Sequence, residues 1–240
     1  MNEPVRVAVS GAMGKMGQTI IKGLLAEKGL TLVAAIDPDF AGSSVMKGVS
    51  LEVAGNIAEV LGQSKAQVLI DFTRPDVGGK NALEAVKLSV RPVVGTTGIP
   101  EEEIAQVQEE CGRRDLAAAF IPNFSLGILA LKRCARQVAP LLPRAEVIEM
   151  HHDQKLDAPS GTAISISRHI TTCTGQEVPI HSVRLPGLVA HHEVLFGALG
   201  QTLSLRHDTM SRDAFLPGLF LAVRRILEVT GVKRDMEELL

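Results

Sequence analysis

The stretch from Glu149 to Ala163 contains the residue types that proton transfer to a small acid would require. It reads EMHHDQKLDAPSGTA, so that two adjacent histidines and a lysine precede a Pro-Ser-Gly-Thr turn. Histidine and lysine side chains can donate a proton to a reacting group, and the lysine adds a positive charge. A helix that begins at such a turn has backbone N–H groups without intrahelical acceptors, and these groups bind carboxylates. The pattern therefore predicts a site for a small dianionic substrate that is protonated during its reaction.

These residues also have plainer interpretations. In an extended strand His151 and His152 would point to opposite faces, so one would face the substrate and the other would support it, unless the chain turns there. Lys155 could be an ordinary surface lysine. Ser160 and Thr162 could be helix caps and nothing more.

A glycine-rich turn near the N-terminus predicts a second binding site. The sequence GAMGKMG at residues 11–17 follows an apolar strand and opens a helix, with the spacing GxxGxxG. Gly11 would permit the tight turn, Gly14 the approach of a pyrophosphate, and Gly17 close helix–strand packing. Asp37, at the end of the next strand, could accept hydrogen bonds from adenosine ribose hydroxyls. The alternative is a glycine-rich turn that binds no ligand.

The residues after Asp37 bear on the choice of dinucleotide. Asp39 follows closely, and no cation occurs until Lys47. Two carboxylates would repel the 2′-phosphate of NADPH, so we expect NADH to be used at least as well as NADPH. Lys15 or Lys47 could offset this repulsion if either folds over the phosphate.

The elements that must position these residues follow two patterns. In the first half, strands at residues 5–9, 30–36, 68–72, 92–94 and 116–121 alternate with helices at 14–27, at 81–88 and from residue 100 onward. This alternation predicts a parallel sheet with helices on both faces, and ligands at the carboxyl ends of its strands. Those ends carry the small polar runs Asp71–Phe72–Thr73, Gly95–Thr96–Thr97 and Pro122–Asn123–Phe124.

Beyond these runs the pattern changes. Helices are predicted at residues 125–142 and 161–172, and strands at 145–150, 180–184, 193–196 and 202–205. Strands in quick succession indicate a mixed or antiparallel sheet, whereas a helix at 213–230 would return to the first domain. We therefore expect an α/β protein with residues 1–123 and 213–240 in one domain, and 124–212 in a smaller α+β domain.

Composition excludes several classes of function. Of the 240 residues 45% are hydrophobic and the net charge is -2, so a nucleic-acid or other polyanion partner is not expected. No apolar run reaches the ~18 residues of a membrane span. The three cysteines form no CxxC pair, which favours reduced, buried thiols in a cytoplasmic protein. A second histidine pair at 191–192 has neither HxxxH spacing nor a cysteine partner, so we expect no metal.

Together these motifs resemble one family, the 4-hydroxy-tetrahydrodipicolinate (dihydrodipicolinate) reductases. The resemblance rests on GAMGKMG, on DFT at 71–73, GTTG at 95–98 and PNFS at 122–125, and above all on EMHHDQKLDAPSGTA. It implies a Rossmann-type, doubly wound domain and a smaller domain that binds substrate and builds a homotetramer. It also implies an NAD(P)H-dependent reduction of a cyclic dicarboxylate in the diaminopimelate and lysine pathway.

The resemblance also implies roles for individual residues. His151 and Lys155 match the proton donors. His152, Gly161 and Thr162 match substrate contacts, and Ser160 lies in the same substrate-binding loop. The implied cofactor contacts are Gly11, Ala12, Met13, Gly14, Lys15, Met16, Asp37, Phe72, Gly95, Thr96, Thr97, Ile121, Pro122, Asn123 and Phe124.

One stretch departs from the family pattern. Many members carry a run like GGxIVGEH, where this chain has Leu185–Pro186 and Ala190–His191, and we expect a stiffer loop. Two other functions remain open at this point. One is a dinucleotide-dependent dehydrogenase of amino or hydroxy acids, and the other is a dinucleotide-sensing module without catalysis.

Overall fold

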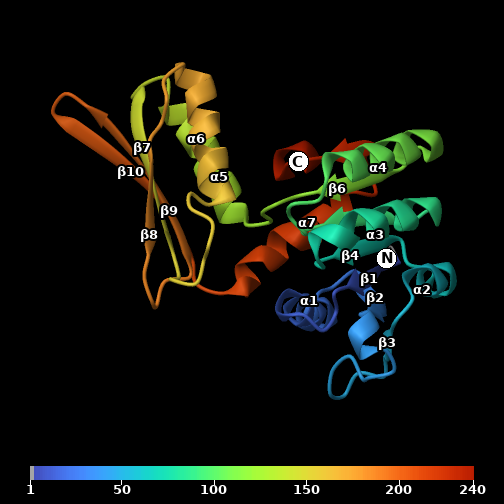
Figure 1. Ribbon diagram of the computed structural model, residues 1–240. Coiled ribbons are helices and arrows are strands. Elements are labelled where there is room, and N and C mark those ends of the chain that lie inside the picture. The colour runs from blue at the N-terminus through green and yellow to red at the C-terminus, as the bar shows by residue number, and fades with distance from the viewer. Residues whose placement is uncertain (1–2) are drawn as a thin grey trace. The chain divides into compact units, whose positions relative to one another are not determined.

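The computed structural model describes residues 3–240, which divide into two compact units (Figure 1). The first comprises the chain up to Phe124 together with Leu216–Leu240, and the second comprises Ser125–Phe215. Each unit has its own sheet and its own hydrophobic core.

The first unit is built on a seven-stranded parallel sheet. Its order is β11 (Gly231–Lys233), β6 (Ala117–Phe120), β5 (Arg91–Val94), β4 (Val68–Asp71), β1 (Val5–Ser10), β2 (Leu30–Ile36) and β3 (Val53–Ala54). All six pairings are parallel. Strands β4 and β6 are buried at every residue, as expected for strands that helices cover on both faces.

Helices cover both faces of this sheet. They are α1 (Lys15–Ala26), α2 (Ile57–Ser64), α3 (Pro75–Lys87), α4 (Glu101–Arg114) and α7 (Leu216–Arg225), with short 3₁₀ turns at Pro38–Phe40 and Met236–Leu239. Helix α3 contacts both α2 and α4, whereas α7 contacts α1. A Cβ on Gly23 of α1 would lie 2.8 Å from Leu216 of α7, so the missing side chain permits this packing.

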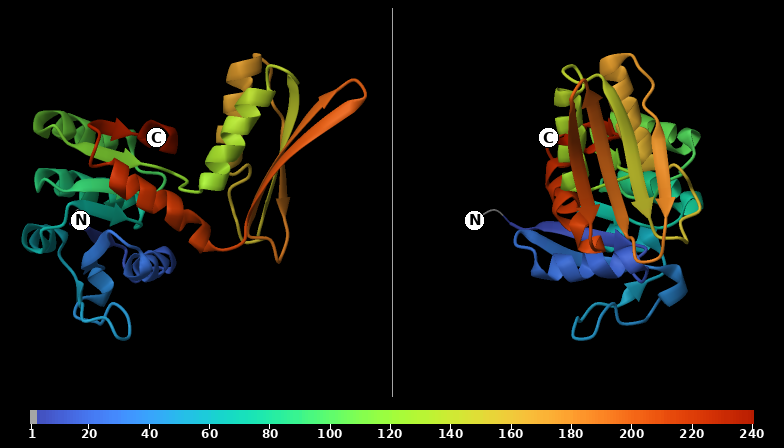
Figure 2. Two further views of the ribbon diagram at one scale, coloured as in Figure 1. Left: turned by 180° about the vertical axis from the view of Figure 1, so that it is seen from behind. Right: turned by 90° about the vertical axis from the view of Figure 1, so that its left-hand side faces the viewer.

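The second unit is a four-stranded mixed sheet with two helices on one face. Its order is β10 (Gln201–Thr209), β9 (Ala190–Ala198), β7 (Arg144–His151) and β8 (Ile180–Arg184), and only β7 and β8 are parallel. Figure 2 shows α5 (Leu126–Val138) and α6 (Gly161–Thr174) on one face and no element of this unit on the other. On β7 every second residue from Ala145 to His151 is buried, because alternate side chains point to the helix-covered face.

These two sheets confirm the predicted fold class. Several details of the prediction were wrong. The predicted helix at 213–230 is a 3₁₀ turn at Arg212–Phe215 followed by α7, and residues beyond it form β11, which joins the sheet beside β6. The helix predicted at 81–88 begins earlier, at Pro75, since proline is readily accommodated in a first turn. Helix α2 and the short strand β3 were missed.

The cysteines also differ from expectation. Cys111 is buried, and burial raises its pKa to about 11, but Cys134 and Cys173 are exposed. All three are free thiols. Within residues 3–240, no helix combines the length and apolar character that crossing a membrane requires.

Candidate active site

The glycine-rich turn forms a tight backbone cradle before α1. Gly11 has φ +73°, and a Cβ there would lie 2.3 Å from the carbonyl oxygen of Phe72. A Cβ on Gly17 would lie 2.1 Å from the carbonyl oxygen of Gly11. Helix α1 has no side-chain cap and no acidic residue in its first turn. Its first N–H groups can therefore receive an anion such as a pyrophosphate.

A cavity of about 350 Å³ opens beside this cradle. It is lined by Gly11 and Gly14, by Asp37 and Asp39, and by Phe72, among others. The Asp37 carboxylate accepts a hydrogen bond from the backbone N–H of Met13 at 3.0 Å, which fixes the acid against the turn. Arg74 also lines the cavity, and the sequence argument missed this cation because it follows a different strand.

The loops after β4 and β5 are tied together by a buried carboxylate. Asp71 is fully buried and accepts hydrogen bonds from the hydroxyls of Thr73 and Thr96 at 2.7 and 2.9 Å, and from the amide of Asn81 at 2.8 Å. The backbone N–H of Thr73 donates to the Thr96 hydroxyl at 2.8 Å. Thr96 and its neighbours thereby hold a fixed position at the carboxyl end of the sheet.

The other predicted cofactor residues have different surroundings. Thr96, Thr97 and Pro122 line a second cavity of about 250 Å³ with Arg234 and Glu101. Ala12, Ile121 and Phe124 are buried, so their side chains pack in the core. Gly95 lies against the ring of Phe72, where a Cβ would come within 2.2 Å of a ring atom. Lys15 and Met16 form the first turn of α1, and Asn123 follows Pro122.

In the second unit, β7 ends at His151 and the chain then turns. His151 is buried with only 7% of its surface exposed, whereas His152 is exposed. The chain reverses through residues 153–159 and reaches Ser160, whose hydroxyl accepts the backbone N–H of Ala163 at 3.2 Å. Ser160 is therefore the N-cap of α6, and no acid occurs in the first turn of that helix.

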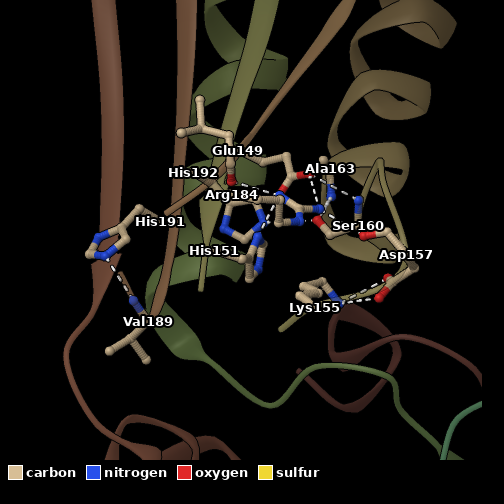
Figure 3. Close-up of polar contacts among 11 residues, drawn as sticks. Glu149, His151, Lys155, Asp157, Ser160, Ala163, Arg184, Val189, His191 and His192 are labelled. Carbon is tan, nitrogen blue, oxygen red and sulfur yellow. Dashed lines mark hydrogen bonds and ion pairs between the residues drawn. The ribbon is translucent and has the colours of Figure 1, made fainter. Parts of the chain in front are cut away.

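A buried carboxylate that the sequence argument missed organises this site. Glu149 is fully buried on the same face of β7 as His151, and one of its oxygens contacts His151 Nδ1 (Figure 3). Its other oxygen accepts hydrogen bonds from Arg184 Nη2 at 2.7 Å and from the Ser160 N–H at 3.4 Å. Burial alone would raise the pKa of Glu149, but hydrogen bonds from Arg184, Ser182 and His151 lower it to about 2.

Burial and the neighbouring charges also change the pKa of His151. Burial lowers the pKa of His151, since a buried imidazole is harder to charge, and the Glu149 carboxylate opposes this effect. The positive charges of Lys155 and Arg184 lower the pKa further.

His192 is a second residue that the sequence argument did not place in the site. Its ring stands edge-on to that of His151 with 5.3 Å between centroids, and its Nε2 lies 3.4 Å from the Ser160 hydroxyl. Burial, followed by the nearby charge of His151, lowers the pKa of His192 to about 4, so it is neutral at pH 7. The pairing of Glu149 with His192 across β7 and β9 brings it there.

Lys155 is the more accessible of the two predicted proton donors. Its ammonium donates to both oxygens of Asp157 at 2.7 and 2.9 Å, and its side chain is 24% exposed. This hydrogen bond lowers the pKa of Asp157. Gly161 and Thr162 follow Ser160 in the first turn of α6. Residues 3–240 contain no group of three or more His, Cys, Asp or Glu side chains that could hold a metal ion.

Two family models match nearly the whole chain. The model described as dihydrodipicolinate reductase, N-terminus, matches residues 5–124, and that described as dihydrodipicolinate reductase, C-terminus, matches residues 127–240.

Curated relatives give the same result. The chain is 42% identical over 247 residues to a 4-hydroxy-tetrahydrodipicolinate reductase of Symbiobacterium thermophilum, covering 98% of this chain and 97% of that protein. It is 40% identical over 261 residues to one of Moorella thermoacetica, covering 98% of both.

Solved structures also match the fold of this chain. A dipicolinate-bound dihydrodipicolinate reductase from Paenisporosarcina sp. TG-14 matches with a TM-score of 0.88 and 33% identity over 99% of this chain and 100% of that chain. An amine dehydrogenase from Mycobacterium smegmatis matches with a TM-score of 0.70 at 12% identity, over 95% of this chain and 94% of that one, a likeness of fold alone.

Proposed function

This chain belongs to the dihydrodipicolinate reductase family, and we propose that it reduces 4-hydroxy-tetrahydrodipicolinate to tetrahydrodipicolinate with NAD(P)H. The reaction proceeds through the dehydration product dihydrodipicolinate and belongs to the diaminopimelate and lysine pathway. The observation that carries the proposal is the buried His151, held by Glu149 beside the N-terminus of α6, in a chain that both family models match.

The dinucleotide supplies a hydride from C4 of its nicotinamide. Residues of the first unit fit such a molecule, because the Gly11 and Gly17 positions admit no Cβ and leave the N–H groups of the first turn of α1 accessible. Gly11, Ala12, Met13, Gly14, Lys15 and Met16 would hold the pyrophosphate, and Asp37 the adenosine ribose. Phe72, Gly95, Thr96, Thr97, Ile121, Pro122, Asn123 and Phe124 would hold the nicotinamide half.

The cavity beside Asp37 contains charges of both signs. Asp37 and Asp39 disfavour a 2′-phosphate, whereas Arg74 would attract one. Since two acids face one cation, we propose that NADH is used at least as well as NADPH. The ratio of kcat/KM for the two cofactors tests this, and an NADPH preference of about a hundredfold or more would contradict it.

The substrate carboxylates would bind around the α6 N-terminus. Gly161 and Thr162 offer first-turn N–H groups, Lys155 offers a positive charge, and exposed His152 offers a further donor. Holding the diacid at fixed points orients its ring for hydride addition.

His151 and Lys155 would supply the proton that the reduction requires. Hydride addition places negative charge on the conjugated imine ring, and one proton per hydride completes the reduction. Nδ1 of His151 is engaged by Glu149, so its Nε2 is the atom that can deliver a proton.

An assay of cofactor oxidation separates this proposal from the alternatives. Purified protein is given NADH or NADPH and substrate formed freshly from aspartate semialdehyde and pyruvate. The proposal predicts substrate-dependent oxidation of the cofactor. Oxidation with amino or hydroxy acids but not with this substrate would indicate another dehydrogenase, and cofactor binding without turnover on any of them would indicate a sensing module.

The uncovered face of the second sheet is relevant to how copies of this chain associate. Side chains that alternate with the buried set, such as Met150, Val183 and Leu195, lie on this face by strand register. We propose that a second copy covers it within a cytoplasmic homotetramer. Light scattering during gel filtration should give a tetramer, and Leu195→Arg should yield a smaller species. A wild-type monomer would contradict the proposal.

A further inference from the structure

We propose that Glu149 is a positioning residue for the proton donor, which fixes the tautomer and ring orientation of His151 and ties that ring to the helix end beside it. This inference rests on the proposed function, in which His151 delivers a proton. Glu149 itself would not touch the substrate, because it is fully buried beneath His151.

The two oxygens of Glu149 have different partners. One contacts His151 Nδ1, and the other receives the Arg184 guanidinium and the Ser160 backbone N–H. Guanidinium and backbone N–H groups can only donate, so they require an acceptor on that oxygen. They hold the carboxylate in its ionised form, and its pKa of about 2 agrees with this.

An ionised carboxylate cannot donate a hydrogen bond. The hydrogen between Glu149 and His151 must therefore reside on Nδ1 of the imidazole. In the neutral ring this leaves Nε2 as the basic atom, which gains a proton before the reaction and releases it during the reaction. Without the carboxylate, either nitrogen could carry the hydrogen.

Within residues 3–240, Glu149 is the group around His151 that favours the charged form of the imidazole. The charged or titratable groups that face His151 are Glu149 on its own strand, Arg184 on β8, His192 on β9 and Lys155 in the following turn. Arg184 and Lys155 are cations and disfavour a second positive charge, and burial acts in the same direction. Removing the charge of Glu149 would leave the buried imidazole without an opposite charge.

The same carboxylate fixes the segment that carries the substrate contacts. Arg184 Nη2, while bound to Glu149, also donates to the backbone carbonyl of Asp157 at 2.7 Å. Glu149 accepts from Ser160 at the start of α6. The last part of the turn from His152 to Ser160 is thus held at Asp157 and Ser160 by one carboxylate and its arginine. Lys155 lies two residues before Asp157 in this turn.

A purely structural role is the alternative, because a buried ion pair with Arg184 would also need Glu149. The tautomer of His151 distinguishes the two without any substitution. We would label histidine with ¹⁵N and record ring nitrogen shifts in the NADH-bound protein. The expected neutral form of His151 carries hydrogen on Nδ1, and the Nε2–H form would overturn the inference. His181 is an internal reference, since its Nε2 contacts Glu146 at 2.7 Å, and the opposite tautomer is expected there.

The matched substitutions are Glu149→Gln and Glu146→Gln, which remove a carboxylate from the same strand beside an imidazole. Glu146 is 57% exposed and lies outside both proposed ligand sites. It pairs with Leu195 on the proposed subunit-contact face, so gel filtration first establishes that Glu146→Gln keeps the wild-type oligomer. Glu149→Gln should lower the pKa of His151 in the NMR titration and move the alkaline limb of kcat/KM to lower pH. It should also reduce kcat at least about tenfold, compared with about 10⁴ for the analogous amide substitution in the serine-protease triad. Glu146→Gln should change none of these.

The outcomes separate the two claims. If Glu149→Gln folds and binds NADH but leaves the His151 titration and the alkaline limb in place, the inference is wrong and Glu149 is structural. If this variant does not fold, the wild-type tautomer decides. If His151 behaves as expected but the wild-type protein does not oxidise NADH with the substrate, the proposed function fails instead.

Discussion

Replacing His151 with glutamine removes the proposed proton donor and little else. The Gln amide can still donate a hydrogen bond to Glu149, so the buried carboxylate keeps a partner and the ion pair with Arg184 remains. Losing a positioned acid typically costs about 10²–10⁴ in rate, and kcat should fall within this range. Lys155 and water would supply the residual proton.

The affinity for NADH should stay nearly unchanged, because the residues of the proposed dinucleotide site belong to the other compact unit. Steady-state kinetics and fluorescence titration with NADH measure the two effects. His181→Gln is the control, since this histidine pairs with Glu146 outside both proposed ligand sites, and gel filtration establishes that the variant keeps the wild-type oligomer. A His151→Gln protein that retains more than about a third of wild-type kcat would remove His151 from the mechanism.

Lys155, the Gly11 turn and the pH dependence of the reaction each provide a further test. Lys155→Ala should lower kcat and raise the substrate KM, because the same ammonium would donate a proton and attract a carboxylate. An unchanged substrate KM would remove Lys155 from the substrate site. Gly11→Ala should weaken NADH binding, since its Cβ would lie 2.3 Å from the Phe72 carbonyl, and calorimetry showing wild-type affinity would contradict the cradle. A proton-donating imidazole works only while charged, so kcat/KM should be highest below the His151 pKa and fall as pH rises through it. Because burial lowers that pKa, the fall should begin at lower pH than for an exposed histidine. A His151→Gln profile with the same alkaline limb would refute the assignment.

The sequence predicted the parts of the fold that depend on local patterns. Buried parallel strands such as β4 are short, mostly apolar runs that hydrophobicity identifies. Strand β7 alternates in burial but not in hydrophobicity, because Glu149 and His151 occupy buried positions. Helix α2 and strands β3 and β11 were missed because they are only eight, two and three residues long. Such short elements depend on pairing with a neighbour more than on their own sequence.

The candidate site was predicted in part for the same reason. His151, Lys155 and the Ser160 turn are close in sequence and were identified together. Glu149 looked like an ordinary strand residue, and its role became visible only through the Arg184 contact from β8. The period of two along β7 could have indicated that Glu149 and His151 share a face.

His192 and Arg74 required pairings that the sequence does not reveal. His192 reaches Ser160 because β9 pairs antiparallel with β7 in one register, which places it opposite Glu149. Arg74 enters the cavity of Asp37 from the loop after β4, since β4 neighbours β1 in the sheet. Both contacts depend on strand order, which local patterns leave open.

A single-turnover experiment shows whether His151 supplies the proton for the reduction. Protein in excess, loaded with NADH, is mixed with freshly formed substrate, and the loss of nicotinamide absorbance is followed for wild-type and His151→Gln proteins. Wild-type protein should oxidise NADH rapidly, and the variant should do so at least about a hundredfold more slowly, with both ligands bound in each case. Wild-type protein that binds both ligands without oxidising NADH, or a variant that oxidises it at the wild-type rate, would contradict the account.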